Sequence, residues 1–331
     1  MAVVPGKSVD VVCIGSAIVD VISHADEAFL EKHAMTKGSM QLIEDDVVHA
    51  LYDDMPPAVE TSGGSAANTA AGIASFGGSV GFIGKVAEDV LGEVFTHDIR
   101  AAGVAYDPVK VVDGLATARC LILVTSDAER TMNTYLGVSG LIEPDDVDDV
   151  TAGSAQVLYT EAYLWDLPAA KAALVKGMTT AAGAGGKVAF SLSDSFCVDR
   201  HRAELLDLAR EHVDILFGND AEICSLYETE SFDEAADRAA ADVEIACLTR
   251  GAAGSVIVHG DQRIAIAAEP IERLVDTTGA GDLYAAGFLF GYTNDRDLET
   301  SGRLASIAAA ECIQHMGARP EITLEQLAKD L

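Results

Sequence analysis

Basic residues are scarce in this chain of 331 residues, which has 22 Lys and Arg against 53 Asp and Glu and a formal net charge of −31 at pH 7. A surface this acidic repels nucleic acid and anionic membranes, so neither is an expected partner. We interpret the charge as a source of solubility, and a specific cationic partner is the alternative. Any anionic ligand needs local dipoles, a cation or a few basic side chains to hold it.

Metal and disulfide patterns are also absent. The six cysteines form no C-x-x-C pair and lie mostly in apolar segments, which is typical of buried, reduced thiols. No apolar stretch reaches the roughly 18–20 residues of a membrane span, and the first residues lack the apolar core of a signal peptide. There is no Walker loop, no G-x-G-x-x-G after the first strand, no H-E-x-x-H and no G-x-S-x-G. We therefore expect a cytoplasmic protein.

Aromatic residues make up only 6% of the chain, whereas Ala, Val, Ile and Leu are abundant. This composition is typical of helices that cover a buried sheet. Short apolar runs predict strands at residues 9–14, 80–84, 157–160, 188–191, 215–217, 245–248 and 255–258. Helices are predicted at residues 65–76, 90–102, 169–182, 201–210, 220–227, 233–241, 283–293 and 298–316. The alternation predicts an α/β fold with a mainly parallel sheet covered on both faces.

Residues 104–140 have a different texture, because β-prone pieces at 106–112, 118–124 and 130–135 follow one another without a helix. Residues 35–43 are a candidate to join them. We interpret these pieces as a small β lid, formed by segments at about residues 16–50 and 104–140 within a single domain of residues 1–331.

The stretch D-T-T-G-A-G-D at residues 276–282 carries the most chemical information. Gly279, Ala280 and Gly281 have small side chains or none, and the apolar run after them predicts a helix whose first N–H groups point at a ligand. Such a loop is suited to binding an anion. Asp282 at its edge is unfavourable for phosphate alone, but it suits a base that accepts the proton of a substrate hydroxyl. The alternative is a glycine turn in which the Asp caps the helix.

A second glycine turn, G-G-S-A-A-N, opens a predicted helix at residue 63. Gly63 and Gly64 leave the backbone open to a ligand, and Ser65 is predicted to cap the helix. Asn68 can both donate to and accept from a substrate hydroxyl. An ordinary helix start explains this turn equally well.

Three further features are weaker by themselves. Asp20 is a lone acid shortly after the first predicted strand. Asn219 and Glu222 open a helix, where they can hold a hydrated Mg²⁺ or form a capping box. Thr249 and Gly251 follow a strand at the edge where open α/β sheets bind ligands, and a surface turn is the alternative.

In this order, the segments resemble the ribokinase (PfkB) family of carbohydrate and nucleoside kinases over almost the whole chain. The first signature is matched at residues 63–68 and continues through G-F-I-G-K at 81–85. The second is matched at residues 276–289, and the N-x-x-E element at 219–222. The resemblance implies a Rossmann-like three-layer α/β/α core with a small β lid over the acceptor. It also implies Mg²⁺- and ATP-dependent phosphorylation of a primary alcohol.

The resemblance also implies roles for single residues in catalysis and acceptor binding. Asp282 corresponds to the base, and the anion hole is formed by Gly279, Ala280 and Gly281. The groups that bind the hydroxyls of the acceptor correspond to Asp20, Gly63, Gly64 and Asn68. Arg119 departs from the usual pattern of sugar kinases, and it either reaches the transferred phosphate or pairs on the lid surface.

Cofactor-binding residues are implied in the same way. Asn219 and Glu222 correspond to the metal and phosphate region, with Glu222 holding Mg²⁺ through water. The nucleotide site is lined by Thr249 and Gly251. In several members the positions of Asp276 and Thr278 hold a potassium ion, with Gly317 near the loop.

Within the family we expect adenosine as the acceptor, because residues 37–40, 163–166 and 216–222 look like the bacterial adenosine-kinase-like branch. Apolar cover for a purine is predicted from Met40, Met132, Leu136, Tyr163 and Trp165, although a core position is the alternative for Trp165. A kinase for ribose, fructose or 2-keto-3-deoxygluconate is the second hypothesis, and a non-catalytic nucleoside or sugar sensor is the third. The expected partner is a small molecule, and the chain is expected to be a monomer or a homodimer.

Overall fold

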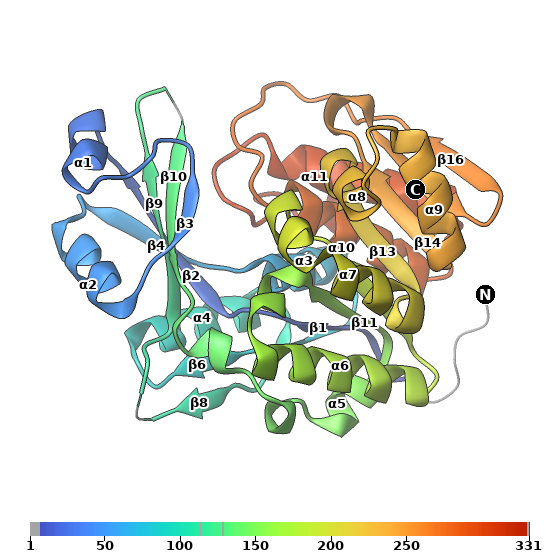
Figure 1. Ribbon diagram of the computed structural model, residues 1–331, viewed down its shortest axis with the longest axis horizontal. Helices are drawn as coiled ribbons and strands as arrows, with labels where there is room; N and C mark the ends of the chain where they lie inside the picture. The colour runs from blue at the N-terminus through green and yellow to red at the C-terminus, as the bar shows by residue number, and fades with distance from the viewer. Residues whose placement is uncertain (1–6, 113, 128, 330) are drawn as a thin grey trace.

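The large sheet has nine strands in the order β16-β15-β14-β13-β12-β11-β1-β5-β7 in the computed structural model, which describes residues 7–112, 114–127, 129–329 and 331 (Figure 1). Neighbouring strands are parallel from β7 to β14, and β15 and β16 add an antiparallel hairpin at one edge. The strands are β1 (Val9–Ile14), β5 (Val80–Ile83), β7 (Ala105–Tyr106), β11 (Ala155–Glu161), β12 (Lys187–Ser191), β13 (Ile215–Asn219), β14 (Ile245–Thr249), β15 (Ser255–His259) and β16 (Gln262–Ile266). The predicted α/β fold with a mainly parallel sheet is confirmed.

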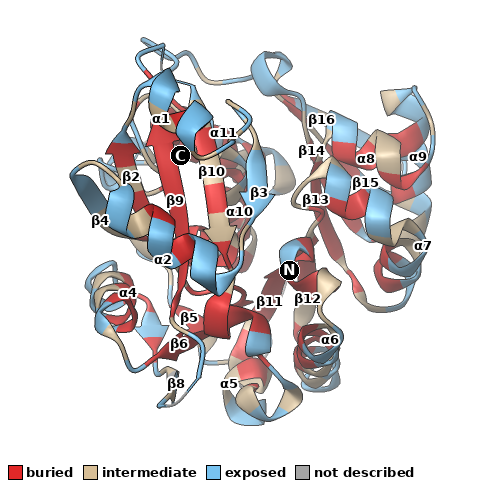
Figure 2. Cartoon of the chain, turned by 60° about the vertical axis from the view of Figure 1, so that its left-hand side comes forward, coloured by how far each residue is buried: buried red, intermediate tan, exposed pale blue. Residues whose placement is uncertain are grey.

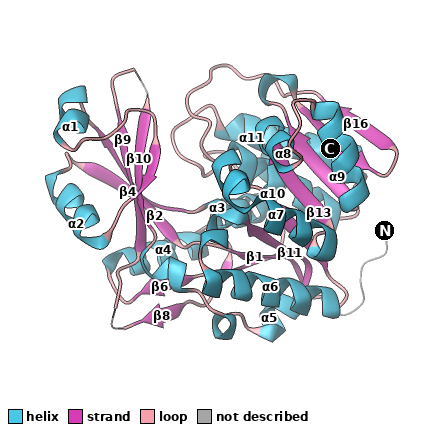
Figure 3. Ribbon diagram, in the orientation of Figure 1, coloured by secondary structure: helices cyan, strands magenta, loops and turns pink. Residues whose placement is uncertain are grey.

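Helices cover both faces of this sheet (Figure 3). Side chains alternate along the strands, so that Val11 and Cys13 of β1 face one layer, and Val12 and Ile14 face the other. The first layer contains α3 (Ser65–Ser75), α4 (Val90–Ala101), α10 (Ala280–Thr293) and α11 (Leu298–Cys312). The second contains α5 (Asp149–Ser154), α6 (Pro168–Gly183), α7 (Ser195–His212), α8 (Asp220–Leu226) and α9 (Phe232–Asp242).

A second sheet of five strands stands beside the first, in the order β3-β10-β9-β2-β4. Its strands are β2 (Ile18–His24), β3 (Met40–Leu42), β4 (Ala58–Gly63), β9 (Ala118–Val124) and β10 (Arg130–Tyr135). One face packs against α1 (Glu27–Lys32) and α2 (Asp45–Asp54), as Figure 2 shows. The other face carries Cys120, Ile122, Val124, Ile18, Ile22 and Met132, which form a small apolar cluster of their own.

The strand predicted at residues 106–112 does not belong to this second sheet. Its first part is β7, at the edge of the large sheet, and β8 (Val109–Val111) pairs with β6 (Lys85–Ala87). Conversely, no strand was predicted at β4, which forms one edge of the second sheet. Its sequence A-V-E-T-S-G has only two apolar side chains, and both are exposed, so an apolar alternation is missing.

The contact between α10 and α11 depends on close backbone approach at Gly287. A Cβ on Gly287 would lie 2.5 Å from the Leu304 carbonyl oxygen and 2.7 Å from the Ala305 Cα, so the helices cannot stay this close with a side chain there. Both helices cover the same face of the large sheet. α10 also begins at the candidate site, so this packing helps to fix the position of that site.

We predict that Gly287→Ala destabilises the protein by about 1–3 kcal/mol, because overpacking outweighs the roughly 1 kcal/mol by which Ala favours a helix. The matched control is Gly183→Ala at the end of α6, where a Cβ meets nothing within 4 Å. Urea unfolding of both variants measures the difference. Equal stability of the two variants would contradict the packing argument.

Candidate active site

The candidate site lies at the first turn of α10, where the loop that begins at Asp276 enters the helix. Gly279 precedes the helix with φ +79°, and a Cβ there would lie 2.5 Å from the Cβ of Ala318. Both observations require glycine at this position. The N–H groups of Gly279, Gly281 and Asp282 find no acceptor among the described residues, whereas the Ala280 N–H donates to the Thr277 carbonyl at 3.2 Å.

The space in front of this loop is open, since a Cβ on Gly281 would meet nothing within 4 Å. Unpaired N–H groups and the positive end of the helix dipole therefore face an unfilled volume. This geometry is suited to binding an anion. The anion hole expected at Gly279 and Gly281 stays a prediction, and the Ala280 N–H is partly engaged by the turn itself.

The Asp282 side chain is held by two residues of α3. Its Oδ1 accepts from the Ser65 hydroxyl at 2.7 Å, and its Oδ2 accepts from the Asn68 amide at 2.9 Å. Burial raises the pKa of Asp282, and these hydrogen bonds together with the charge of Arg319 oppose the rise. The two hydrogen bonds therefore orient the carboxylate, and its pKa depends on them and on the charge of Arg319.

Ser65 was predicted to cap α3, and that prediction is wrong. The N-cap is Gly64, with φ +90°, and a Cβ on it would lie 2.3 Å from the Ser16 carbonyl oxygen. Ser65 is instead the first residue of the helix. Its hydroxyl is free to bond to Asp282, which joins the two glycine turns of the sequence in one site.

Asp20 of β2 faces the same space from the second sheet. Its carboxylate accepts no hydrogen bond from the described residues, and a Cβ on Gly63 would lie 2.3 Å from its Oδ2. Burial raises the pKa of Asp20 to about 7, against the opposing charges of Arg319 and Arg130. An acid that is largely withdrawn from water and has free acceptor atoms is suited to binding the hydroxyls of a ligand.

Glu161 is a site residue that the sequence analysis missed. It ends β11, is 1% exposed, and has a buried Oε2 with no hydrogen-bond partner among the described residues. Burial raises the pKa of Glu161 to about 7, and hydrogen bonding with Ser65 opposes the rise. Its position at the carboxyl end of a central parallel strand was the one signal available in the sequence.

Two arginines, Arg130 and Arg319, were also missed. A guanidinium nitrogen of Arg130, on β10, lies 2.7 Å from Asp276 Oδ2, and another donates to the Thr278 hydroxyl at 3.2 Å. Both side chains of the Arg130–Asp276 pair are nearly buried, so the second sheet is joined to the loop before α10 by a strong contact. The charges of Asp20 and Asp282 act on Arg319, which forms no ion pair within 4.0 Å among the residues that the structure describes.

The potassium ion predicted at Asp276 and Thr278 stays a prediction, and Arg130 already contacts both residues. Asp276 Oδ1 accepts from the Thr278 N–H, and its Oδ2 accepts from both the Gly317 N–H and Arg130. The positive charge that a cation would supply is already present as a guanidinium. An ion at this position would share the Asp276 carboxylate with Arg130.

Asn219 and Glu222 form the capping box that the sequence analysis kept as an alternative. The Asn219 side chain accepts from the Glu222 N–H, and the Glu222 carboxylate accepts from the Asn219 N–H, each at 2.9 Å. Burial raises the pKa of Glu222 to about 7. Each carboxylate oxygen keeps a second lone pair, so these residues also fit a Mg²⁺ held through water, which would neutralise phosphate charge there.

The predicted nucleotide-binding residues lie beside this capping box. Asn219 and Thr249 are register partners at the carboxyl ends of β13 and β14. Gly251 has φ +53° and open space around it. These residues therefore share the edge of the sheet that carries the other candidate residues.

Two other predicted residues lie elsewhere. Arg119 is on the face of β9 opposite to Cys120, where its guanidinium contacts the rings of Tyr52 and Tyr135, so it does not point into the candidate site. Trp165 is buried against Phe190 and belongs to the core. The alternative of a core position for Trp165 is thus confirmed.

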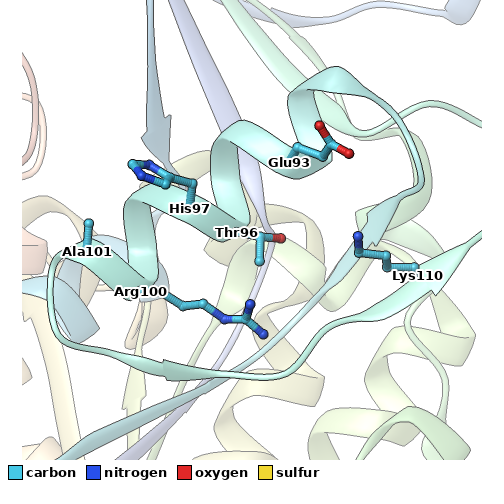
Figure 4. Close-up of a pocket in the computed structure, with 6 residues that line it drawn as sticks. All are labelled: Glu93, Thr96, His97, Arg100, Ala101 and Lys110. Atoms are coloured by element: carbon cyan, nitrogen blue, oxygen red, sulfur yellow. The ribbon is translucent and has the colours of Figure 1, made fainter.

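A surface groove of about 480 Å³ lies along α4, away from these groups (Figure 4). It is lined by Glu93, Thr96, His97, Arg100, Ala101 and Lys110. Among the described residues, no three His, Cys, Asp or Glu side chains form a cluster that could bind a metal directly. No helix in the described part of the chain has the length and apolar character of a membrane span.

A nine-stranded α/β core, a second sheet beside it and a candidate anion-binding loop next to an oriented carboxylate are typical of a phosphotransferase that acts on an alcohol. The comparison with known sequences is consistent with this class. Residues 9–324 match the pfkB family of carbohydrate kinases, and the chain belongs to that family.

Individual relatives include both nucleoside and sugar kinases. The crystal structure of adenosine kinase from Sinorhizobium meliloti is 50% identical, with a TM-score of 0.91 over 97% of this chain and 99% of that one. That of a probable sugar kinase from Rhizobium etli CFN 42 is 48% identical, with a TM-score of 0.91 over 98% of both chains. An ATP-dependent ribose-1-phosphate kinase from Halopiger xanaduensis is 31% identical over 81% of this chain and 86% of its own.

We predict that Glu161→Gln weakens the dependence of stability on pH. Because its pKa is about 7 in the folded protein, Glu161 binds a proton that the unfolded chain releases near pH 4.5, so its contribution to stability falls as pH rises through that window. Gln stays neutral, and the midpoint of thermal unfolding should fall less between pH 5 and pH 7.5 in the variant. Asp20 and Glu222 keep part of the slope.

The control for this experiment is Glu325→Gln, which removes a negative charge at an exposed position of α12 (Leu324–Leu327). Its profile is expected to follow the wild type. A Glu161→Gln profile that also follows the wild type would show that Glu161 is ionised in the folded protein.

Proposed function

We propose that this protein transfers the γ-phosphoryl group of ATP to a primary hydroxyl of adenosine, which gives AMP and ADP. The observation that carries the proposal is the Asp282 carboxylate, which is fixed by Ser65 and Asn68 beside unpaired N–H groups at the start of α10. A base and an anion site in contact are what phosphoryl transfer to an alcohol requires.

Asp282 accepts the proton of the acceptor hydroxyl as its oxygen attacks the γ-phosphorus. The bond between that phosphorus and the bridging oxygen of ADP breaks, and ADP leaves. The N–H groups of Gly279 and Gly281 face the negative charge on the phosphoryl oxygens in flight. Mg²⁺ near Glu222 would neutralise part of the charge of ATP.

The acceptor is held from the opposite side by the second sheet. Asp20 and Asn68 offer polar atoms for ribose hydroxyls, and the backbone at Gly63 and Gly64 lets the sugar approach closely. Around Asp20, the same sheet face is apolar, with Ile18, Ile22, Cys120 and Ile122 among its members. Met132 belongs to this cluster, and Met40 is its register partner on β3. An apolar wall beside a polar sugar site suits a purine nucleoside.

The relatives support adenosine without excluding a sugar. The 50% identity to an adenosine kinase over nearly the whole chain favours the nucleoside. The similarly high identity to a probable sugar kinase favours the second hypothesis, a kinase for ribose, fructose or 2-keto-3-deoxygluconate. A non-catalytic sensor is disfavoured, because a sensor has no use for an oriented base beside an anion loop.

We predict that Asp282→Asn lowers kcat by at least about 10³-fold while the acceptor still binds, since Asn preserves the shape but cannot accept the proton. Isothermal titration with adenosine and a coupled assay for ADP measure the two effects. The matched control is Asp297→Asn at the N-cap of α11, which removes an aspartate remote from the loop. Near-normal turnover by Asp282→Asn would remove Asp282 as the base.

A substrate panel decides between the two acceptor classes. With ATP and Mg²⁺, we expect kcat/KM for adenosine to exceed that for ribose, fructose and 2-keto-3-deoxygluconate by at least about 10²-fold, because those acceptors leave the apolar wall unfilled. Inosine, which also carries a purine, is included to test whether the base itself is selected. Phosphorylated products are identified by mass spectrometry. Turnover of a sugar without turnover of adenosine would establish the second hypothesis instead.

A further inference from the structure

Three consecutive residues after α11 contact both glycine turns of the site. The Gly317 N–H donates to Asp276 Oδ2 at 3.0 Å, and Ala318 packs directly on Gly279. Arg319 extends from there to the other turn, at the start of α3. The segment 317–319 therefore connects two loops that are more than 200 positions apart in the sequence.

The Arg319 guanidinium makes three hydrogen bonds to that second turn. Its Nη1 donates to the Ala67 carbonyl at 2.8 Å, its Nε donates to the Ser62 carbonyl at 3.3 Å, and its Nη2 donates to the Ser62 hydroxyl at 3.3 Å. These acceptors lie on both sides of the glycine pair. Ala67 stands between the two residues, Ser65 and Asn68, that hold the Asp282 carboxylate.

The hydrogen-bond acceptors of Arg319 among the described residues are all uncharged, so no single carboxylate neutralises its positive charge. Burial lowers the pKa of Arg319 to about 10, which leaves it cationic at neutral pH. The acids that act on it are Asp282 of α10, Asp20 of β2 and Asp98 of α4.

Other charged side chains surround these acids. The charges of Glu161 on β11 and Asp282 act on each other. Asp276, on the loop before α10, and Arg130, on β10, both act on Asp20. Arg319 is the cation that acts on Asp282 itself among these described neighbours. Arg319 thus affects the Asp282 carboxylate in two ways. Its hydrogen bonds hold the turn that carries Ser65 and Asn68, and its positive charge acts on Asp282 directly.

We propose that Arg319 is a positioning residue for phosphoryl transfer, which holds the turn carrying Ser65 and Asn68 against the Gly279 loop and places a fixed positive charge beside Asp282. The inference rests on the proposed function, in which Asp282 is the base. Arg319 does not itself touch the reacting atoms. It acts by keeping the base in place and by favouring its ionised form.

The first test compares Arg319→Met and Arg319→Lys with wild type in steady-state kinetics from pH 5 to pH 9. We expect Arg319→Met to lower kcat by about 10–100-fold with KM for ATP changed no more than about twofold. The acid limb of its kcat/KM profile should move up by roughly 0.5–1 pH unit, because a positive charge near the base is lost. Arg319→Lys should keep the acid limb near that of wild type while kcat is still reduced.

The matched control is Arg202→Met on α7. Arg202 likewise donates to a backbone carbonyl and a serine hydroxyl, both of Ser225, but it lies on the opposite layer of the large sheet. It also forms ion pairs with the exposed Asp199 and Glu228, so its loss tests the removal of a charged, hydrogen-bonded arginine far from Asp282. A purely structural loss lowers the unfolding midpoint of both Met variants and leaves both acid limbs in place. That outcome for Arg319→Met, or a wild-type kcat in it, would overturn the inference.

The second test needs no turnover and therefore separates this inference from the proposed function. Urea unfolding at pH 7 of wild type, Arg319→Met, Asp282→Asn and the double variant forms a double-mutant cycle. We expect Arg319→Met to shift the midpoint less in the Asp282→Asn background, where the partner charge is gone. Equal shifts of the midpoint in both backgrounds overturn the inference. A wild-type protein that phosphorylates no acceptor refutes the proposed function, and the double-mutant cycle then still tests the coupling between Arg319 and Asp282.

Discussion

The candidate site depends on holding several carboxylates together in a space withdrawn from water. Asp20, Glu161, Asp276 and Asp282 lie around one another, and burial raises the pKa of three of them. Like charges at close range and low dielectric oppose ionisation, so the arrangement requires donors and cations at defined points. The formal net charge of −31 adds to the need for nearby donors and cations, because the excess of acidic residues does not stabilise further negative charge.

The compensation is divided among different elements of the fold. Arg130 neutralises Asp276 from the second sheet, Ser65 and Asn68 satisfy Asp282 from α3, and Arg319 contributes from the segment after α11. Asp276 and Asp282 are thus each held by groups from other parts of the chain. The catalytic geometry is a product of the tertiary fold, and the two glycine motifs alone do not produce it.

The sequence analysis predicted the large sheet and its covering helices well, because buried parallel strands are continuous apolar runs such as residues 245–248. It predicted the second sheet less well. Polar edge strands such as β4 carry no apolar alternation, and residues 106–112 looked like part of the same block although they pair elsewhere. The local residue pattern of a segment does not determine which distant segment it pairs with as a strand.

The same limit applies to the site. The glycine turns and Asp282 were recognisable, since their small residues and spacing have a local meaning. Glu161 and Arg319 were not, because an acid at the end of a strand and an arginine after a glycine acquire a role only through neighbours that are far away in the sequence. Arg119 was considered as a contact of the transferred phosphate because of its sequence position alone. Side chains alternate along β9, so Arg119 lies on the face opposite to Cys120 and contacts Tyr52 instead.

One residue separates the second sheet from α3, the helix whose side chains hold the Asp282 carboxylate. β4 ends at Gly63 and α3 begins at Ser65, so Gly64 is the whole connection between them. Any change in the position of β4 is transmitted to Ser65 and Asn68, and hence to Asp282. If the acceptor binds to this sheet as proposed, its binding is thermodynamically linked to the protonation of Asp282, and by reciprocity each alters the equilibrium of the other. On that proposal, the pKa of Asp282 differs between the free protein and its complex with the acceptor.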